Sequence, residues 1–202
     1  MTSASGNPVS SPHKSIAIFA SGAGSNAKKI IDHFSQHPFI KVRFIVCNKP
    51  TAGVVDIAAA NRIATLLIEK EKFFRGNGYA DELKEAQIDF IVLAGFLWKI
   101  PQTIINAYRN RIVNIHPALL PKFGGKGMYG SKVHEAVIAA GESESGITIH
   151  YADEHYDKGD IIFQAKCEVS RSDTAESLSQ KIQALEHEHF PKVIEKLLSE
   201  MR

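Results

Sequence analysis

Two polar side chains, Asn114 and His116, stand at the end of an apolar run that a proline terminates. Successive side chains of a strand point to opposite faces, so these two share one face while Val113 and Ile115 share the other. Pro117 has no backbone N–H to give to a ladder, and the strand is therefore expected to stop there. The sequence thus predicts that an amide and an imidazole emerge together at the rim of a sheet, where open α/β folds place ligands.

An amide beside an imidazole suits chemistry at a carbonyl group. Asn114 and His116 offer two donors toward one point, as a developing oxyanion requires, and the histidine can exchange a proton near neutral pH. A nearby carboxylate would orient the imidazole and raise its pKa. On spacing alone, the candidates for that carboxylate are Asp153, Glu154, Asp157 and Asp160.

A glycine-rich run, Ser-Gly-Ala-Gly-Ser-Asn at residues 21–26, lies between a predicted strand and a predicted helix. Ala27 replaces the third glycine of the dinucleotide fingerprint, and the next strand ends in Cys-Asn-Lys with no acid for a ribose hydroxyl. A nicotinamide cofactor is therefore disfavoured. The free N–H groups at a helix N-terminus, with Ser25 and Asn26 as further donors, suit one phosphate. A plain tight turn is the alternative.

The elements that must position these groups alternate between strand and helix. Apolar runs predict strands at 16–20, 41–47, 64–68, 89–94 and 112–116, and helical patterns lie at 27–34, 54–61, 79–85, 101–108 and 132–140. This alternation predicts an α/β fold with a Rossmann-like, open, mostly parallel sheet covered on both faces. Two last runs, 146–151 and 161–169, are close enough in sequence to pair antiparallel.

A long helix is predicted at the C-terminus. Asp173 is expected to cap it, with Glu176 three residues on as in a capping box, and Pro191 is expected to kink or restart it. Gln183 and Glu186, three apart, share a face of this helix and would point into a site or remain on a solvated surface. The run Glu-His-Glu-His at 186–189 lacks metal-ligand spacing, and no metal site is expected.

The composition limits the partners. The 202 residues include 24 Lys and Arg against 22 Asp and Glu, and the net charge of +2 argues for neither a nucleic acid nor a membrane partner. Two cysteines form no disulfide framework, and no run approaches the length of a membrane span. Residues 1–14 resemble a disordered leader without a signal peptide. A protein of the reducing cytoplasm is expected. The loop 122–131 is either a lid over a phosphate or simply flexible.

Taken together, these motifs resemble those of the folate-dependent formyltransferases, and within them the glycinamide ribonucleotide branch. The matching stretches are 21–26, the Val-Leu-Ala-Gly-Phe run at 92–96, the Asn-Ile-His-Pro-Ala-Leu-Leu-Pro run at 114–121, the loop around Asp157, and 183–187. The resemblance implies that residues 15–202 form a single formyltransferase domain. It also implies small-molecule substrates, 5-phosphoribosylglycinamide and 10-formyltetrahydrofolate as co-substrate, and no metal or nicotinamide.

The resemblance also assigns roles to residues. The implied catalytic residues are Asn114, His116 and Asp157, with Asp157 keeping His116 charged. The implied ribonucleotide contacts are Gly24, Ser25, Asn26, Gln183 and Glu186. The implied folate contacts are Leu97, Trp98, Lys99, Ile100, Asn114, Asp153, Glu154, His155, Tyr156 and Asp157.

The expected reaction is transfer of a formyl group to the amine of 5-phosphoribosylglycinamide in de novo purine (IMP) biosynthesis. Rival expectations are a formyltransferase for another amine, such as an aminoacyl-tRNA or an amino sugar nucleotide, a formyltetrahydrofolate hydrolase, and a catalytically silent folate- or nucleotide-binding module. The chain departs from the family at Trp98, where an arginine is frequent, and at Gly76, where a second arginine is expected and Arg75 lies one place off.

Overall fold

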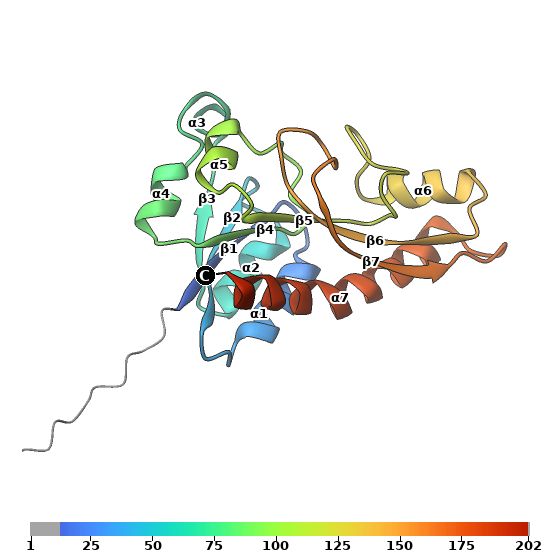
Figure 1. Cartoon of the computed structure of the whole chain (residues 1–202), viewed down its shortest axis with the longest axis horizontal. Helices are drawn as coiled ribbons and strands as arrows, with labels where there is room; N and C mark the ends of the chain where they lie inside the picture. Colours follow the sequence, from blue (N-terminus) through green and yellow to red (C-terminus); the bar gives the residue numbers. More distant parts are fainter. Residues whose placement is uncertain (1–12, 202) are drawn as a thin grey trace, which may run out of the picture.

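The computed structural model describes residues 13–201, and its central feature is a seven-stranded sheet in the order β3-β2-β1-β4-β5-β6-β7 (Figure 1). The strands are β1 Lys14–Ala20, β2 Ile40–Cys47, β3 Ala64–Leu67, β4 Phe90–Leu93, β5 Ile112–His116, β6 Glu144–Tyr151 and β7 Ile161–Glu168. Strands β1 to β5 pair in parallel, whereas β6 pairs antiparallel with both β5 and β7. The predicted fold class, with its antiparallel C-terminal pair, is confirmed.

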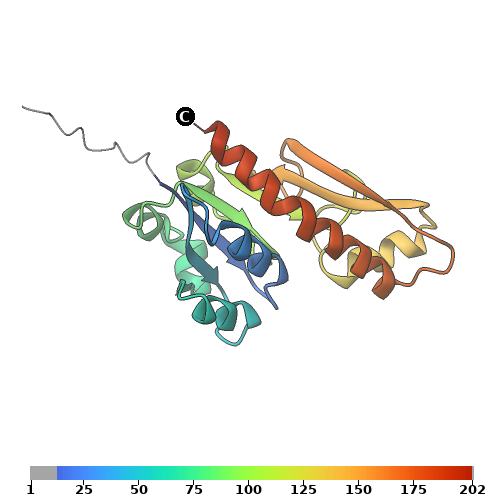
Figure 2. The same cartoon turned by 90° about the horizontal axis from the view of Figure 1, so that it is seen from below.

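The helices cover both faces of the sheet (Figure 2). They are α1 Ser25–Phe34, α2 Gly53–Ala60, α3 Lys70–Arg75, α4 Ala80–Glu85, α5 Gln102–Ala107, α6 Ser131–Ala139 and α7 Ala175–Glu200. Buried side chains of α1, α2 and α7 form one apolar cluster with the sheet, and those of α3, α4 and α5 form a second. Two hydrophobic cores therefore hold the two faces.

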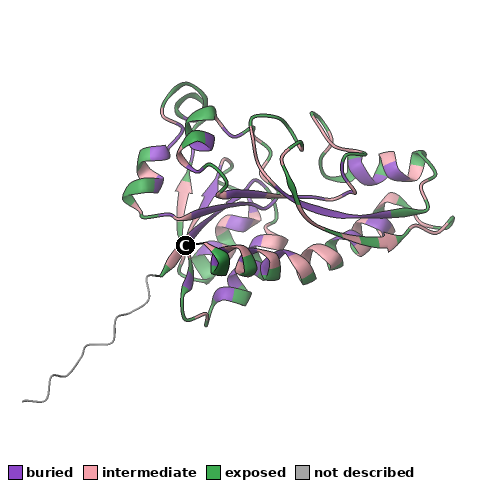
Figure 3. Ribbon diagram, viewed as in Figure 1, coloured by how far each residue is buried: buried purple, intermediate pink, exposed green. Residues whose placement is uncertain are grey.

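The central strands are buried on both faces, as Figure 3 shows. All four residues of β4 are buried, which explains why its sequence is a continuous apolar run rather than an alternating one. The edge strand β7 instead alternates exposed and half-buried residues. Strand β5 lies between the fully buried β4 and the antiparallel pair of β6 and β7.

Several element boundaries differ from the sequence predictions. Strand β1 begins at Lys14, inside the predicted leader, because the Lys14 N–H bonds to the Phe39 carbonyl. Residues 1–12 of that leader lie outside the described part of the chain. The helix α3 was not predicted, because it is a single short piece in which only Phe73 is buried. Pro101 precedes α5 as its N-cap instead of lying in its first turn.

Thr174 caps the start of α7. The prediction that Asp173 is the cap is wrong. The Thr174 hydroxyl accepts the Ser177 N–H at 3.2 Å, and the Ser177 hydroxyl accepts the Thr174 N–H at 3.0 Å. The predicted partner Glu176 takes no part in this capping box. Asp173 instead binds the Lys181 ammonium at 2.5 Å, and this contact and hydrogen bonds hold the pKa of its carboxyl well below its usual range.

Of the two predicted effects of Pro191 on α7, a kink or a restart, the restart is wrong, since one helix runs from Ala175 to Glu200. Pro191 costs the helix one backbone hydrogen bond. Phe190 before it and Ile194 after it are both fully buried in the same apolar cluster, so packing holds the two halves on one face. Among the described residues, no helix is long and apolar enough to cross a membrane.

Candidate active site

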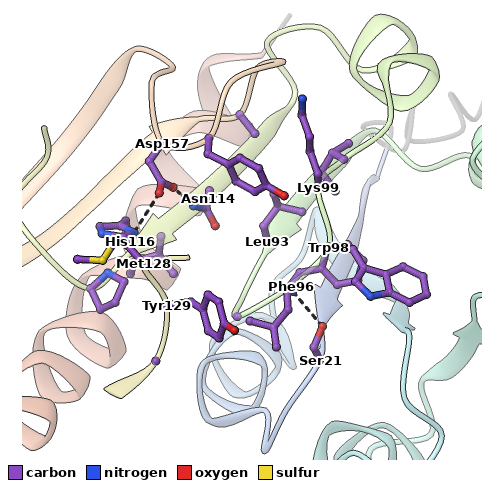
Figure 4. Close-up of a pocket in the computed structure, with 18 of the residues that line it drawn as sticks. Ser21, Leu93, Phe96, Trp98, Lys99, Asn114, His116, Met128, Tyr129 and Asp157 are labelled. Atoms are coloured by element: carbon purple, nitrogen blue, oxygen red, sulfur yellow. Dashed lines mark hydrogen bonds and ion pairs between the residues drawn. The ribbon is translucent and has the colours of Figure 1, made fainter. Parts of the chain in front are cut away.

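Asn114 and His116 lie at the carboxyl end of β5, where the parallel part of the sheet meets the antiparallel pair. Both side chains line a cavity of about 500 Å³, shown in Figure 4. Ligand pockets of enzymes have this size. The structure thus brings the two polar residues together at the sheet rim, as their spacing in the sequence predicts.

The His116 ring is held by a backbone carbonyl on one side and a carboxylate on the other. Its Nε2 lies 2.8 Å from the Phe123 carbonyl oxygen, which can only accept, so Nε2 carries a proton. Its Nδ1 lies 3.6 Å from Asp157 Oδ2. Burial lowers the pKa of His116, while Asp157 and the Phe123 carbonyl act in the opposite direction. Burial is the larger effect, so the pKa of His116 lies below its usual range. This direction opposes the charged ring that the resemblance implies.

Asp157 is fixed by its own backbone and by the loop 122–131. Its φ of 55° is in the left-handed region, which is uncommon for a residue with a side chain. Its Oδ2 accepts the Gly125 N–H at 2.8 Å. Burial raises the pKa of the Asp157 carboxyl, but the Gly125 N–H and the nearby His116 ring act in the opposite direction, so the pKa lies below its usual range. A charged carboxylate therefore faces His116.

The other three acidic candidates of this loop are not placed beside His116. Asp153 accepts the His155 N–H at 2.7 Å. Glu154 and Asp160 are exposed. Of the four carboxylates that spacing left open, only Asp157 faces the His116 ring, with its Oδ2 3.6 Å from Nδ1.

The glycine turn 21–26 places its polar groups at the N-terminus of α1. Gly24 has a φ of +81°, and a Cβ there would lie 2.8 Å from Val54 Cβ, so only glycine fits this turn. Asn26 lines the cavity, whereas Gly24 and Ser25 do not. The helix α1 has ten residues, and its unpaired N–H groups and positive end suit an anion.

The last helix contributes the two polar residues that the sequence placed on one face. Glu186 Oε2 accepts from Asn26 Nδ2 at 2.8 Å, and Gln183 Nε2 donates to Ser25 Oγ at 3.3 Å. Glu186 lines the cavity and Gln183 does not. Burial raises the pKa of the Glu186 carboxyl. The structure therefore joins two segments about 160 positions apart into one polar end of the cavity.

The opposite end of the cavity is formed by Leu97, Trp98, Lys99 and Ile100. Trp98 packs against Phe73 and Phe74, each with ring centroids 5.5 Å away. The Leu97 N–H donates to Ser21 Oγ at 3.0 Å, which ties this end to the glycine turn. This end of the cavity therefore has an apolar wall in which Trp98 packs against the second apolar cluster.

The facing loop completes this end. Asp153, His155, Tyr156 and Asp157 line the cavity, whereas Glu154 of the predicted set does not. The Lys99 ammonium lies 5.9 Å from the centre of the Tyr156 ring, across the mouth. Arg75, which stands one place from the expected arginine, pairs with Glu71 at 2.8 Å and is not among the lining residues.

Sequence reasoning missed several lining residues. His150 and His134 are both buried, and Ser21, Met128 and Tyr129 also face the cavity. His150 stands in a predicted strand, 146–151, that is mostly apolar apart from Thr148, and that contrast was an available signal. Tyr129, about half exposed, and Met128 come from the loop 122–131, so this loop forms part of the cavity wall.

Within residues 13–201, no group of three or more His, Cys, Asp or Glu side chains is arranged to bind a metal ion. His187 and His189 are two apart on α7. Both cysteines are free, and Cys47 is buried.

Comparison with known proteins gives one family. The family model described as Formyl transferase matches residues 14–194. The chain is 42% identical to the chloroplastic phosphoribosylglycinamide formyltransferase of Vigna unguiculata over 93% of this chain, and spans 62% of that relative. It is 36% identical to the phosphoribosylglycinamide formyltransferase of Bacillus subtilis (strain 168), covering 92% of this chain and 95% of that one. The chain thus spans less than two thirds of the plant relative.

Solved structures share this fold. The crystal structure of phosphoribosylglycinamide formyltransferase from Bacillus halodurans is similar, with a TM-score of 0.83 and 40% identity over 93% of this chain and 96% of that chain. That of glycinamide ribonucleotide transformylase 1 from Geobacillus kaustophilus has a TM-score of 0.84 and 36% identity, over 92% and 99% of the two chains.

Proposed function

Because this chain belongs to the formyl transferase family, we propose that it transfers the formyl group of 10-formyltetrahydrofolate to the amine of 5-phosphoribosylglycinamide. The products are the N-formyl ribonucleotide and tetrahydrofolate, in de novo purine biosynthesis. One observation carries the proposal: Asn114, His116 and Asp157 line one cavity together with the polar pair Asn26 and Glu186 and the apolar segment 97–100.

The polar end supports binding of the ribonucleotide. The N-terminus of α1 receives the phosphate, with the backbone of Gly24 and the side chains of Ser25 and Asn26 as donors. Glu186, beside Asn26, accepts hydrogen bonds from ribose hydroxyls, and Gln183 orients Ser25. Asn26 Oδ1 is buried without a protein partner and is free to accept from a bound group.

The apolar end supports binding of the folate. Residues 97–100 hold the pterin through backbone groups, and residues 153–157 close over its other side. Lys99 and Tyr156 stand at the mouth, where the rest of the folate leaves the cavity. The co-substrate supplies the reactive formyl carbon, and the chain holds that carbon next to Asn114 and His116.

The chemistry at the centre follows from the placement of three side chains. The amine nitrogen of the ribonucleotide bonds to the formyl carbon, while Asn114 Nδ2 donates to the oxygen on which negative charge develops. The proton lost by the amine passes to His116 Nδ1, whose lone pair is free because Nε2 donates to Phe123. Asp157 stabilises the imidazolium, which then returns the proton to the departing folate nitrogen.

This order of proton transfers reconciles the lowered pKa of His116 with a charged ring during the reaction. A neutral ring takes up the proton, and the ion pair with Asp157 forms only when the imidazolium appears. Holding both reactants in one cavity supplies much of the remaining rate acceleration.

The test is an assay of the purified protein with 10-formyltetrahydrofolate and a panel of amines that includes glycinamide ribonucleotide, an aminoacyl-tRNA and an amino sugar nucleotide. We expect product with glycinamide ribonucleotide alone. Product only with another amine, or formate release without an amine, would reassign the substrate or the reaction class. Binding of both small molecules without any product would indicate a silent module. The cytoplasmic location stays a prediction.

A further inference from the structure

His150 is the direct cross-strand neighbour of Asn114 in the antiparallel pair of β5 and β6. Its side chain is buried, yet it lines the cavity beside Asn114 and Asp157. The chemistry derived above gives this residue no role. Its hydrogen bonds nevertheless determine which end of the Asn114 amide faces the reaction centre.

The protonation of the His150 ring follows from a fixed acceptor. His150 Nδ1 lies 2.8 Å from the Tyr151 carbonyl oxygen, which can only accept a hydrogen bond, so Nδ1 carries a proton. In a neutral ring, Nε2 is then an acceptor. His116 shows the same arrangement with the nitrogens exchanged, since its Nε2 is the one bound to a carbonyl.

The acceptor at Nε2 fixes the amide beside it. Asn114 Nδ2 lies 3.1 Å from His150 Nε2 and 3.5 Å from Asp157 Oδ1. The separation of 3.6 Å between His150 Nε2 and Asp157 Oδ1 is too long for a hydrogen bond. The two hydrogens of the primary amide therefore point to two acceptors, and the amide nitrogen joins them.

We propose that His150 is a positioning residue for the formyl transfer: it accepts a hydrogen bond from Asn114 Nδ2 and thereby keeps the donor end of the amide at the reaction centre. This inference rests on the proposed function. The bond to His150 is short, whereas the contact with Asp157 is long and easily exchanged for a stronger acceptor. The second N–H of Asn114 is thus available to the oxyanion.

If the Asn114 amide were turned the other way, the rate of formyl transfer would fall. Asn114 Oδ1 would then face the bare nitrogen of His150 and the Asp157 carboxylate, and no donor would be directed to the developing oxyanion. Since an oxyanion donor contributes about a hundredfold to a thousandfold to kcat, losing its orientation part of the time is expected to cost about tenfold or more.

A matched pair of variants tests the acceptor. His150→Leu fills a similar volume without an acceptor, and His150→Gln places an amide oxygen near the position of Nε2. We expect His150→Leu to lower kcat about tenfold or more with little change in either KM, and His150→Gln to retain most of the activity. Equal losses in the two variants, with melting temperatures like that of the parent, would overturn the proposal.

A double-mutant cycle separates positioning from an independent role. If His150 acts through Asn114, then adding His150→Leu to Asn114→Ala should change kcat less than twofold. If the two losses multiply, His150 acts on its own and the proposal is wrong.

A measurement without turnover keeps this inference separate from the proposed function. Nitrogen-15 NMR of the His150 ring is expected to show a protonated Nδ1 and a bare Nε2 coupled through a hydrogen bond to Asn114 Nδ2. A protonated Nε2 would refute the positioning role even in an active enzyme. A parent protein without formyl transfer would instead refute the proposed function, whatever the ring shows.

Discussion

Asp157 Oδ2 accepts the backbone N–H of Gly125 at 2.8 Å, so the carboxylate beside His116 is held by the glycine loop 122–130. The same loop supplies the Phe123 carbonyl that holds His116 Nε2. Both members of the ion pair therefore depend on the path of one loop. Close packing fixes that path, because a Cβ on Gly124 would clash with Leu120 Cδ2 and lie 3.3 Å from Asp157 Cβ.

Gly124→Ala is expected to displace Asp157 and lower kcat about tenfold or more, since small misplacements of reacting groups are costly. Lys126→Ala in the same loop is the control, because Lys126 is exposed and does not line the cavity. Steady-state kinetics of both variants measure the effect. An unchanged kcat in Gly124→Ala would show that the loop does not set the position of the carboxylate.

Asp157→Asn keeps the shape of the side chain and removes its charge. We expect kcat to fall about a hundredfold or more, because the imidazolium formed at His116 loses its partner. Asp160→Asn is the matched control, an exposed acid of the same loop. Equal activities for the two variants would show that Asp157 is not the carboxylate that stabilises the His116 imidazolium.

The stability of the fold should fall on mild acidification. Burial lowers the pKa values of His116, His134 and His187 below the ordinary 6.5, so the unfolded chain binds protons that the folded chain refuses. The free energy of unfolding is therefore unaffected above about pH 6.5 and decreases as the pH falls below it. Urea unfolding between pH 7 and pH 5 measures this slope.

The variant His134→Leu is expected to make that decrease smaller. His134 is 5% exposed, and its Nδ1 is buried without a hydrogen-bond partner, so the leucine removes a group that resists charging. The same slope in His134→Leu and in the parent would contradict this account.

Trp98 is the single tryptophan of the chain and lines the apolar end of the cavity. Its fluorescence is expected to change when 10-formyltetrahydrofolate binds and to respond little to the ribonucleotide, which binds at the other end. Trp98→Ala should raise the KM for the folate by up to about tenfold with kcat nearly unchanged, whereas Trp98→Phe should retain most of the affinity. No change in this KM would exclude the aromatic wall from folate binding.

Thr174→Ala removes the acceptor of the capping box at the start of α7. We expect a loss of about 1 kcal/mol in the free energy of unfolding and a melting temperature about 2–4 °C lower. Thr174→Ser retains the hydroxyl and should behave like the parent. A parent-like melting temperature in the alanine variant would show that packing alone fixes this helix end.

The sequence predicted the sheet well because a doubly covered strand has a distinctive pattern. The continuous apolar run of β4 and the alternation in β5 identified both strands and placed Asn114 and His116 on one face. The short helix α3 escaped prediction because it offers one buried residue, Phe73, and no period. At α7, capping chemistry was recognised but assigned one residue early, at Asp173 instead of Thr174.

The site was harder to predict because its partners meet through tertiary pairing. His150 faces Asn114 only because of the antiparallel register, which no local pattern states. Asp157 was one of four acids on spacing alone and was singled out only by the resemblance, whereas in the fold its bond to Gly125 and its position beside His116 distinguish it. The pKa of His116 is a property of burial, and a sequence contains no direct measure of it.

The two ends of the cavity pack against different apolar clusters, which lie on opposite faces of the sheet. The α1 and α7 residues that we propose bind the ribonucleotide lie on one cluster, and the Trp98 wall packs against Phe73 of the other. Substitutions far apart with no shared neighbours combine additively. Substitutions beneath one end should therefore change the affinity for one substrate largely independently of the other, except at Leu97 and Ser21, whose hydrogen bond joins the two ends.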